Sequence, residues 1–172
     1  MVSRQPQEPP EPAAHQERVI RGLFTAVILH GNITASVLGM HPTDLFALGV
    51  VELHGPLGAG ELSERTGLST GATTRLIDRL QRAGQLRRVP DPADRRRVIV
   101  EKVRGHELDE ALNAAFEPIE RGMEEVLSRF PAERLADVMD FLEQTTSAIQ
   151  SATGSVQKIA KTRRSTLDAS GP

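Results

Sequence analysis

Cysteine, tryptophan and tyrosine are all absent from this 172-residue chain, and phenylalanine occurs only five times. Without cysteine the chain has no disulfide framework, no thiolate metal site, no thiol nucleophile and no thiol oxidation switch. Uninterrupted apolar runs of membrane-spanning length are also lacking, as is the basic-then-apolar N-terminus of a signal peptide. We therefore expect a cytoplasmic protein with no membrane partner, whose sensing is noncovalent or involves methionine.

Arrangements typical of catalytic sites are lacking too. The sequence offers no recognisable nucleophile with its base, no paired carboxylates and no phosphate-binding glycine loop. Residues 55–58 (GPLG) are glycine-rich, but they lack the lysine and the spacing of a nucleotide loop. This segment is better explained as a break between two helices. We expect neither enzymatic activity nor a cofactor.

Charge is distributed unevenly along the chain. The formal net charge is −2, yet residues 56–104 carry eleven Arg and Lys against six Asp and Glu, a local net charge of +5. A basic middle between acidic flanks indicates one module that faces a polyanion. The sequence divides accordingly into a disordered tail (1–12), N-terminal helices (13–55), the basic module (56–104), C-terminal helices (105–164) and a second disordered tail (165–172).

Helical periodicity marks the segments on either side of the basic module. A first amphipathic helix is predicted from Ala13 to about Leu38, and Thr43 is predicted to cap a second helix that ends near His54. The second helix is apolar nearly all round, which is typical of an interior helix. Beyond Gly105, apolar residues at helical spacing predict two long helices, the first of them kinked by Pro118. These long helices have more apolar surface than one small core can cover, which favours a dimer.

Two short helices within the basic module predict a helix-turn-helix. The first runs from about Ala59 to Arg65, and Gly67 suits the left-handed position after its end. The second runs from Ser69 to Ala83 and has one apolar stripe, formed by Ala72, Leu76, Leu80 and Ala83. In this motif the second helix normally enters the DNA major groove.

The polar side of that second helix supplies candidate DNA contacts. Its small and hydrogen-bonding side chains suit close approach to bases: Thr and Arg can contact base edges, Ser69 and the helix amides can bind a phosphate, and Gly71 lets the duplex approach. The candidate residues are Ser69, Thr70, Gly71, Thr73, Thr74, Arg75 and Arg79.

A basic hairpin follows the helix-turn-helix. Leu86 to Pro90 and Val98 to Val103 predict two strands, joined by the turn-rich sequence DPADRRR. Arg95, Arg96 and Arg97 can enter a narrow minor groove, where the negative potential is enhanced. Asp94 is placed to accept the Arg96 guanidinium and orient it.

The segment ELSERTGLSTGATTRLIDRLQRAGQLRRVPDPADRRRVIVE, from Glu61 to Glu101, resembles the winged-helix core of the multiple-antibiotic-resistance regulator (MarR) family. The family's Asp-x-Arg wing signature matches Asp94 and Arg96. The resemblance implies a mainly α fold: a winged helix-turn-helix with a short strand before it, a small β-hairpin wing and a helical dimerisation region. Gly58 stands where a Thr or Ser often caps the helix after that strand.

The resemblance also implies a function. Family members are homodimers that read palindromic double-stranded DNA through two recognition helices, usually as repressors released by a small aromatic or anionic ligand. The corresponding effector pocket lies between the dimerisation helices and the DNA-reading module. Candidates for it in this chain are His30, His41, Leu45, Phe46, Leu112 and Phe116.

Two alternatives remain open at this stage. A metal-responsive regulator of the same fold could use His30, His41, His106 and either Asp109 or Glu110, since residues 106 and 110 lie one helical turn apart. A noncatalytic protein-interaction module could use the long amphipathic helices alone. Only the basic wing and the polar helix face argue against that module.

Overall fold

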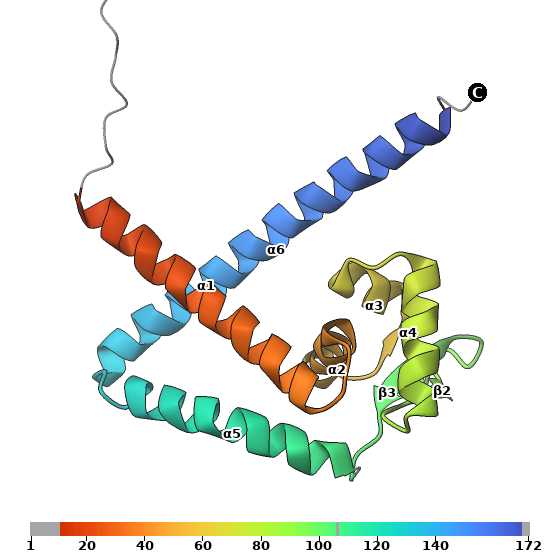
Figure 1. Ribbon diagram of the computed structural model, residues 1–172, viewed down its shortest axis with the longest axis horizontal. Coiled ribbons are helices and arrows are strands. Elements are labelled where there is room, and N and C mark those ends of the chain that lie inside the picture. The colour runs from red at the N-terminus through yellow and green to blue at the C-terminus, as the bar shows by residue number, and fades with distance from the viewer. Residues whose placement is uncertain (1–10, 106, 170–172) are drawn as a thin grey trace, which may run out of the picture. The chain divides into compact units, whose positions relative to one another are not determined.

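The computed structural model describes residues 11–105 and 107–169, with side chains for 13–105, 107–157 and 159. Two compact units follow each other along the chain, the first ending at Asn113 and the second starting at Ala114. The elements are α1 (Glu11–Val37), α2 (Pro42–His54), β1 (Leu57–Gly58), α3 (Ala59–Thr66), α4 (Thr70–Arg82), β2 (Leu86–Pro90), β3 (Val98–Lys102), α5 (Glu107–Leu127) and α6 (Ala132–Ala169) (Figure 1). The predicted mainly α fold with a small sheet is confirmed.

The start of α2 differs from the sequence prediction. His41 is the N-cap residue, and its Nδ1 accepts a hydrogen bond from the Thr43 amide at 3.2 Å. Pro42 occupies the first helical position, where its fixed φ suits the helix and its missing N–H costs nothing. The prediction that Thr43 caps this helix is therefore wrong, and Asp44 lies in the first turn.

The core of the first unit lies between α2, α3, α4 and the sheet. Its members are small and branched apolar residues whose side chains are almost completely removed from solvent: Ala47, Leu48, Val50, Val51, Leu57, Leu62, Leu76, Ile77, Leu80, Leu86 and Val100. The α2 helix contributes four of them, but Phe46 and Leu53 on the same helix are exposed. The expectation of an entirely interior α2 is thus only half right.

The sheet has three antiparallel strands in the order β1-β3-β2. The hairpin strands β2 and β3 pair from Leu86 opposite Lys102 to Pro90 opposite Val98. On the other side of β3, the two residues of β1 pair with Val100 and Ile99. The short strand that the family resemblance implied is therefore present, and it makes β3 the central strand.

Lys102, at the end of β3, joins three elements of the first unit. Its Nζ lies 2.7 Å from Glu52 Oε2 on α2 and 3.1 Å from Asp109 Oδ1 in the first turn of α5. Asp109 Oδ2 also accepts the Gly105 amide. Burial opposes the charge on Lys102, but the hydrogen bonds to Glu52 and Asp109 outweigh it and raise the pKa of the amine above 10.5. We call Lys102, Glu52 and Asp109 together the Lys102 clasp.

The two long C-terminal helices predicted from the periodicity are both present. The α5 helix continues through Pro118 to Leu127, and the kink expected at Pro118 stays a prediction. The α6 helix continues to Ala169, so the disordered tail predicted from Ser165 is wrong as far as that residue. Residues 170–172 and 1–10 of the predicted tails lie outside the described residues. Within the second unit, large apolar side chains are exposed at Ile119, Met123, Val126, Phe130, Met139, Phe141, Ile149, Val156 and Ile159.

The α1 helix also has a large exposed apolar surface. The exposed side chains are Val19, Ile20, Leu23, Phe24, Val27, Ile28, Leu29, Ile33 and Val37. By length and composition the segment Ala13–Val37 passes the test for a membrane-crossing helix. A helix that a soluble protein buries against another surface passes the same test, so this is weak evidence for a membrane.

Candidate nucleic-acid interface

The turn between α3 and α4 is fixed by local hydrogen bonds. Gly67 ends α3 in the left-handed conformation with φ of 72°, which glycine adopts without a Cβ penalty. Ser63 Oγ donates to the Leu68 carbonyl across the turn at 2.7 Å. Ser69 then caps α4 by accepting the Ala72 amide at 3.3 Å. The entry of the chain into α4 is therefore well defined.

One face of α4 is buried and the opposite face is open to solvent. Leu76, Ile77 and Leu80 point into the core. The predicted apolar stripe included Leu76 and Leu80 but not Ile77. On the open face lie Thr70, Gly71, Thr74, Arg75 and Arg82. The open face thus keeps most of the small and basic side chains that the sequence assigned to it.

Thr74 presents its methyl group and oxygen lone pairs on this face. Its hydroxyl donates to the Thr70 carbonyl at 3.0 Å, so the proton is already used within the helix. The oxygen keeps acceptor capacity, which suits the amino groups that adenine and cytosine present in the major groove. The Ser69 oxygen, in contrast, accepts the Ala72 amide as the helix cap, and the amides that precede Ala72 in α4 are left for an anion.

Thr73 is not available for DNA contact. Its side chain is 1% exposed, and its hydroxyl donates to the Ser69 carbonyl at 3.1 Å. The sequence analysis placed Thr73 on a flank of the open face because a helical wheel does not reveal which flank packs on the core. The assignment of Thr73 as a base-reading residue is wrong.

Arg79 is held by a carboxylate from a distant part of the sequence. Its Nε donates to Asp44 Oδ2 at 2.6 Å and its Nη2 donates to Oδ1 at 2.5 Å, a bidentate pair between α4 and the first turn of α2. Asp44 is 5% exposed, whereas the Arg79 side chain is 49% exposed. The hydrogen bond that Arg79 donates to Asp44 is the main cause that raises the pKa of the Arg79 guanidinium above its ordinary value. Asp44 therefore occupies Nε and Nη2 of Arg79, and the DNA contact predicted for Arg79 stays a prediction.

A second ion pair connects α4 to the hairpin. Arg88 on β2 binds Asp78 Oδ1 through Nη2 at 2.6 Å, and its Nη1 hydrogen-bonds to Gln81. The carboxylate of Asp78 on α4 is thereby neutralised. These contacts fix the hairpin against the C-terminal half of α4.

The hairpin tip is shaped by two aspartates. Asp91 accepts the Ala93 amide at 2.8 Å, and Asp94 Oδ1 accepts the Arg96 amide at 3.0 Å. The Asp94 carbonyl also accepts the Arg97 amide at 2.8 Å. Asp94 therefore orients the backbone of the tip, and the expectation that it binds the Arg96 guanidinium is wrong.

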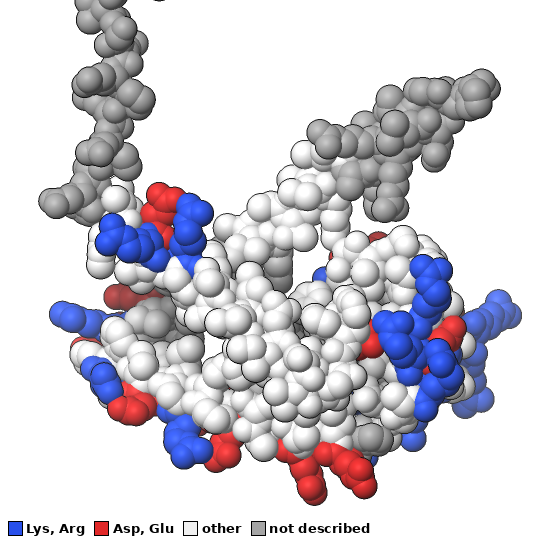
Figure 2. Space-filling model, in the orientation of Figure 1, with Lys and Arg blue, Asp and Glu red and all other residues white. Residues whose placement is uncertain are grey.

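The arginines of the tip are exposed on the same unit as α4. Arg95, Arg96 and Arg97 all belong to the exposed class. Arg97 differs from the other two because its Nη2 lies beside Gly58 of β1, 3.8 Å from where a Cβ would stand. Figure 2 shows the Lys and Arg side chains gathered on the side of the first unit that carries α4 and the hairpin. This arrangement suits a phosphate-lined double helix.

The candidate effector residues of the first unit do not line one common cavity. His41 lines a cavity of about 540 Å³ beside α4, but none of the other five candidates lines it. Leu112 is buried in the first unit, Phe46 is exposed, and Phe116 belongs to the second unit. The cavity is lined instead by groups that include Asp44, Arg75, Arg79 and Gln85, whose buried Oε1 has no hydrogen-bond partner.

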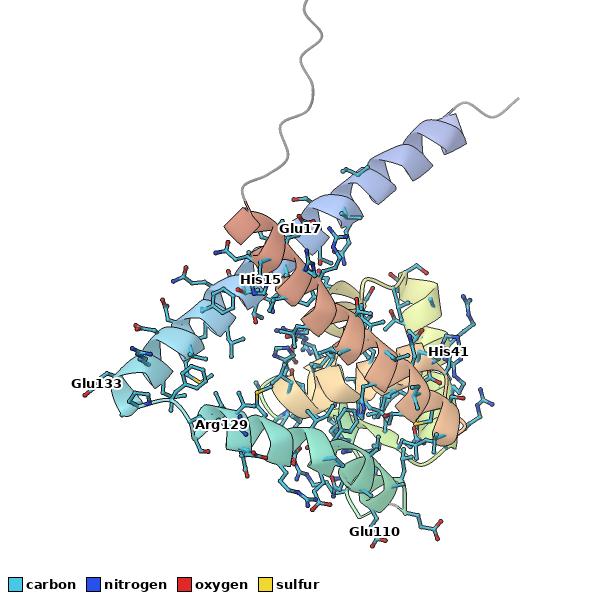
Figure 3. All side chains as sticks on the ribbon, turned by 60° about the vertical axis from the view of Figure 1, so that its left-hand side comes forward. His15, Glu17, His41, Glu110, Arg129 and Glu133 are labelled. Atoms are coloured by element: carbon cyan, nitrogen blue, oxygen red, sulfur yellow. The ribbon has the colours of Figure 1, made fainter. Side chains whose placement is uncertain are left out.

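The histidines form no metal centre within the part of the chain that the structure describes. No group of three or more His, Asp or Glu side chains there could hold a metal ion. His30 contacts Thr34, and Figure 3 shows His15 and His41 near opposite ends of α1. His106, which the metal alternative requires, lies outside the described residues.

Comparisons with known proteins agree with this geometry. The MarR family model matches residues 38–97. The HTH-type transcriptional regulator YcgE of Bacillus subtilis is 34% identical over 125 residues, which are 73% of this chain and 80% of that protein. The chain belongs to the MarR family.

Solved MarR-type structures share the fold. The transcriptional regulator Tm0710 of Thermotoga maritima has a TM-score of 0.55 at 27% identity over 82% of this chain and 98% of its own. Wild-type MarR from E. coli has a TM-score of 0.51 at 22% identity, covering 75% of this chain and 95% of its own. Members of the MarR family are DNA-binding transcriptional regulators, so this chain is a regulator and not an enzyme.

Three functional side chains of this MarR protein were missed in the sequence. Asp44 and Arg88 hold α4 through ion pairs, and Arg82 lies on the open face with its Nε bonded to the Asp78 carbonyl. The sequence does mark Asp44 as unusual, because it is a charged residue in the first turn of a largely apolar helix. Nothing in the sequence indicates that its partner is Arg79, which lies 35 residues further along the chain.

Proposed function

We propose that this MarR protein is a homodimeric repressor that binds a palindromic operator and releases it when a small aromatic or anionic ligand binds. The observation that carries the proposal is the juxtaposition, on one unit, of the open face of α4 with the arginine-bearing tip of the β2–β3 hairpin. Both surfaces are exposed, and both carry side chains that suit DNA grooves.

The α4 helix would lie in the major groove. Thr70 and Thr74 would contact base edges, Gly71 would allow close approach, and Arg75 would bind guanine or a phosphate. The first amides of α4, beyond the Ser69 cap, would bind a backbone phosphate. Sequence preference in this proposal depends mainly on Thr70, Thr74 and Arg75.

The hairpin would lie beside the adjacent minor groove. Arg95 and Arg96 would enter it, Asp94 would hold the tip in shape, and Arg97 would stay close to β1 and contact the backbone. A narrow minor groove attracts arginine through its enhanced negative potential. This contact would therefore favour sequences whose minor groove is narrow.

Dimerisation would use the helices of residues 13–55 and 105–164. The exposed apolar side chains of α1 support this assignment, because monomeric soluble proteins rarely leave so large an apolar surface uncovered. Two-fold symmetry would place the recognition helices about 34–36 Å apart, one turn of DNA. A regulator with this function would act in the cytoplasm.

Ligand response would use the cavity beside α4. Its volume of about 540 Å³ lies within the usual range for small-molecule sites, and Arg75, which has no carboxylate partner among the described side chains, lines it together with Leu68 and Leu76. Cationic and apolar groups in one cavity suit an anionic aromatic molecule. Benzoate is the simplest probe of that class.

Recovery of genomic fragments on the purified protein tests this function. We expect the retained fragments to share an inverted repeat, and binding to survive excess nonspecific competitor and to weaken with salt. Benzoate should lower the affinity. Fragments without a shared motif, or affinity that competitor removes entirely, would contradict operator binding.

A further inference from the structure

The pair between Asp44 and Arg79 bears on how this regulator distinguishes its operator from other DNA. Arg79 lies one helical turn after Arg75 on α4, at the boundary between the open face and the cavity. Arginines on a DNA-reading helix normally bind phosphates, and such contacts strengthen binding to every sequence alike. A phosphate-binding arginine at this position would therefore add affinity without discrimination.

Asp44 removes Arg79 from that role. The carboxylate occupies the Nε and Nη2 atoms of the guanidinium, which are the atoms that grip a phosphate bidentately. Because Asp44 is almost completely buried, losing its partner would leave a buried charge uncompensated. The pair is consequently difficult to open for the sake of one solvent-exposed phosphate contact.

The neighbouring cations of α4 are not restrained in this way. Arg75 is exposed and forms no ion pair with a carboxylate among the described side chains, and its Nη1 lies near Gly71 on the open face. Arg82 bonds only to a main-chain carbonyl, that of Asp78, in the contacts that the structure gives it. Of the three arginines of α4, Arg79 is therefore the one whose charge is neutralised by a buried acid.

We infer that Asp44 is a specificity-determining residue, which binds Arg79 as an internal substitute for phosphate and so lowers the affinity of the regulator for nonspecific DNA. This inference rests on the proposed placement of α4 against DNA. A free Arg79 would reach the phosphate backbone beside Arg75, whereas the paired Arg79 serves only to anchor α4 to α2.

Salt dependence of binding to a short random-sequence duplex tests the inference. We expect Asp44→Asn to steepen the slope of log affinity against log salt by about 0.9 for each subunit that gains a phosphate contact. At 0.1 M salt this corresponds to about eightfold tighter nonspecific binding per contact. The double variant Asp44→Asn/Arg79→Gln should return to the wild-type slope, since it has no arginine to release.

Arg79→Gln in the wild-type background is the matched control. It should leave the slope unchanged, because the paired Arg79 makes no phosphate contact. A flatter slope for this variant would overturn the inference, since Arg79 would then already bind DNA. An unchanged slope for Asp44→Asn, or weaker binding to all duplexes, would overturn it too.

Three further variants cover a failure of folding and a failure of the proposed interface. If Asp44→Asn does not fold, Asp44→Ser also removes the carboxylate and should steepen the slope in the same way. An unchanged slope for Asp44→Ser would overturn the inference. Arg75→Gln and Arg96→Gln should flatten the slope, and if neither does, it is the placement of α4 and the hairpin on DNA that fails.

Discussion

The hydroxyl groups of two neighbouring threonines on α4 differ in whether they are accessible to DNA. Thr73 and Thr74 are adjacent, and each donates a hydrogen bond to a carbonyl one helical turn earlier. Only Thr74 is on the open face, where its oxygen and methyl group remain accessible. Exposure therefore leaves Thr74 as the candidate for base reading, whereas Thr73 is a core residue.

Substitution of each threonine by valine separates the two roles. Thr74→Val removes the acceptor oxygen and keeps the shape, so we expect a changed base preference at one symmetric pair of operator positions, with the free energy of unfolding within about 0.5 kcal/mol of wild type. Thr73→Val is the matched control and should change unfolding by about 1 kcal/mol or less, with no change in preference. Selection of random duplexes checks both, and identical profiles for wild type and Thr74→Val would exclude base reading.

The wing offers a second prediction at this scale. Arg96→Ala should weaken operator binding by about 1–3 kcal/mol without altering helix content, because it removes a groove contact and no structural one. Arg87→Ala is its control, since Arg87 lies within the paired part of β2 and binds Glu101. A titration of operator DNA measures both, and equal losses for the two variants would mean that the tip has no special role.

At the scale of elements, periodicity and turn residues predicted most of the first unit. Gly67 and Gly84 stand after the predicted helix ends with φ near +70°, and β2 has the predicted bounds. What could not be predicted depends on contacts between distant segments: the Asp44–Arg79 pair and the burial of Thr73. Periodicity shows which face of a helix is apolar, but it does not show which other helix packs against that face. These contacts depend on that packing.

The Lys102 clasp gives a prediction about how elements are held together. Lys102→Met should lower the free energy of unfolding by about 1–3 kcal/mol, between the values for exposed and buried pairs, because Glu52 is nearly half exposed. Arg104→Met, which removes the more exposed and more distant partner of Glu52, should change it by less than about 0.5 kcal/mol. Denaturant unfolding compares the two variants.

The pH dependence of that difference follows from the raised pKa of Lys102. A pKa raised in the folded state contributes stability that is complete below the unfolded value of 10.5 and is lost as the pH rises through the folded value. The difference between wild type and Lys102→Met should therefore be constant from about pH 7 to pH 9 and shrink above 10.5. A difference that shrinks between pH 7 and pH 9 would contradict the clasp.

At the scale of the whole molecule, the exposed apolar side chains of α1 decide the expected assembly. Val27 is 60% exposed within a row that includes Leu23. Val27→Glu should shift the protein toward monomer in sedimentation and weaken operator binding, because a charge cannot be buried there unpaired. Thr25→Glu introduces the same charge on the other side of α1 and should leave the dimer intact. Dimers of unchanged strength with Val27→Glu would remove this part of α1 from the interface.

The strand ladder of the hairpin ends where Pro90 faces Val98, so residues 91–97 are outside it. Lengthening a surface loop costs little conformational entropy, and loops tolerate insertion better than the elements they join. Evolution can therefore change the reach and charge of this tip without disturbing α4. In the proposed binding mode, base preference at α4 and minor-groove binding by the tip can therefore change independently in descendants of this regulator. An engineer could exchange residues 91–97 alone.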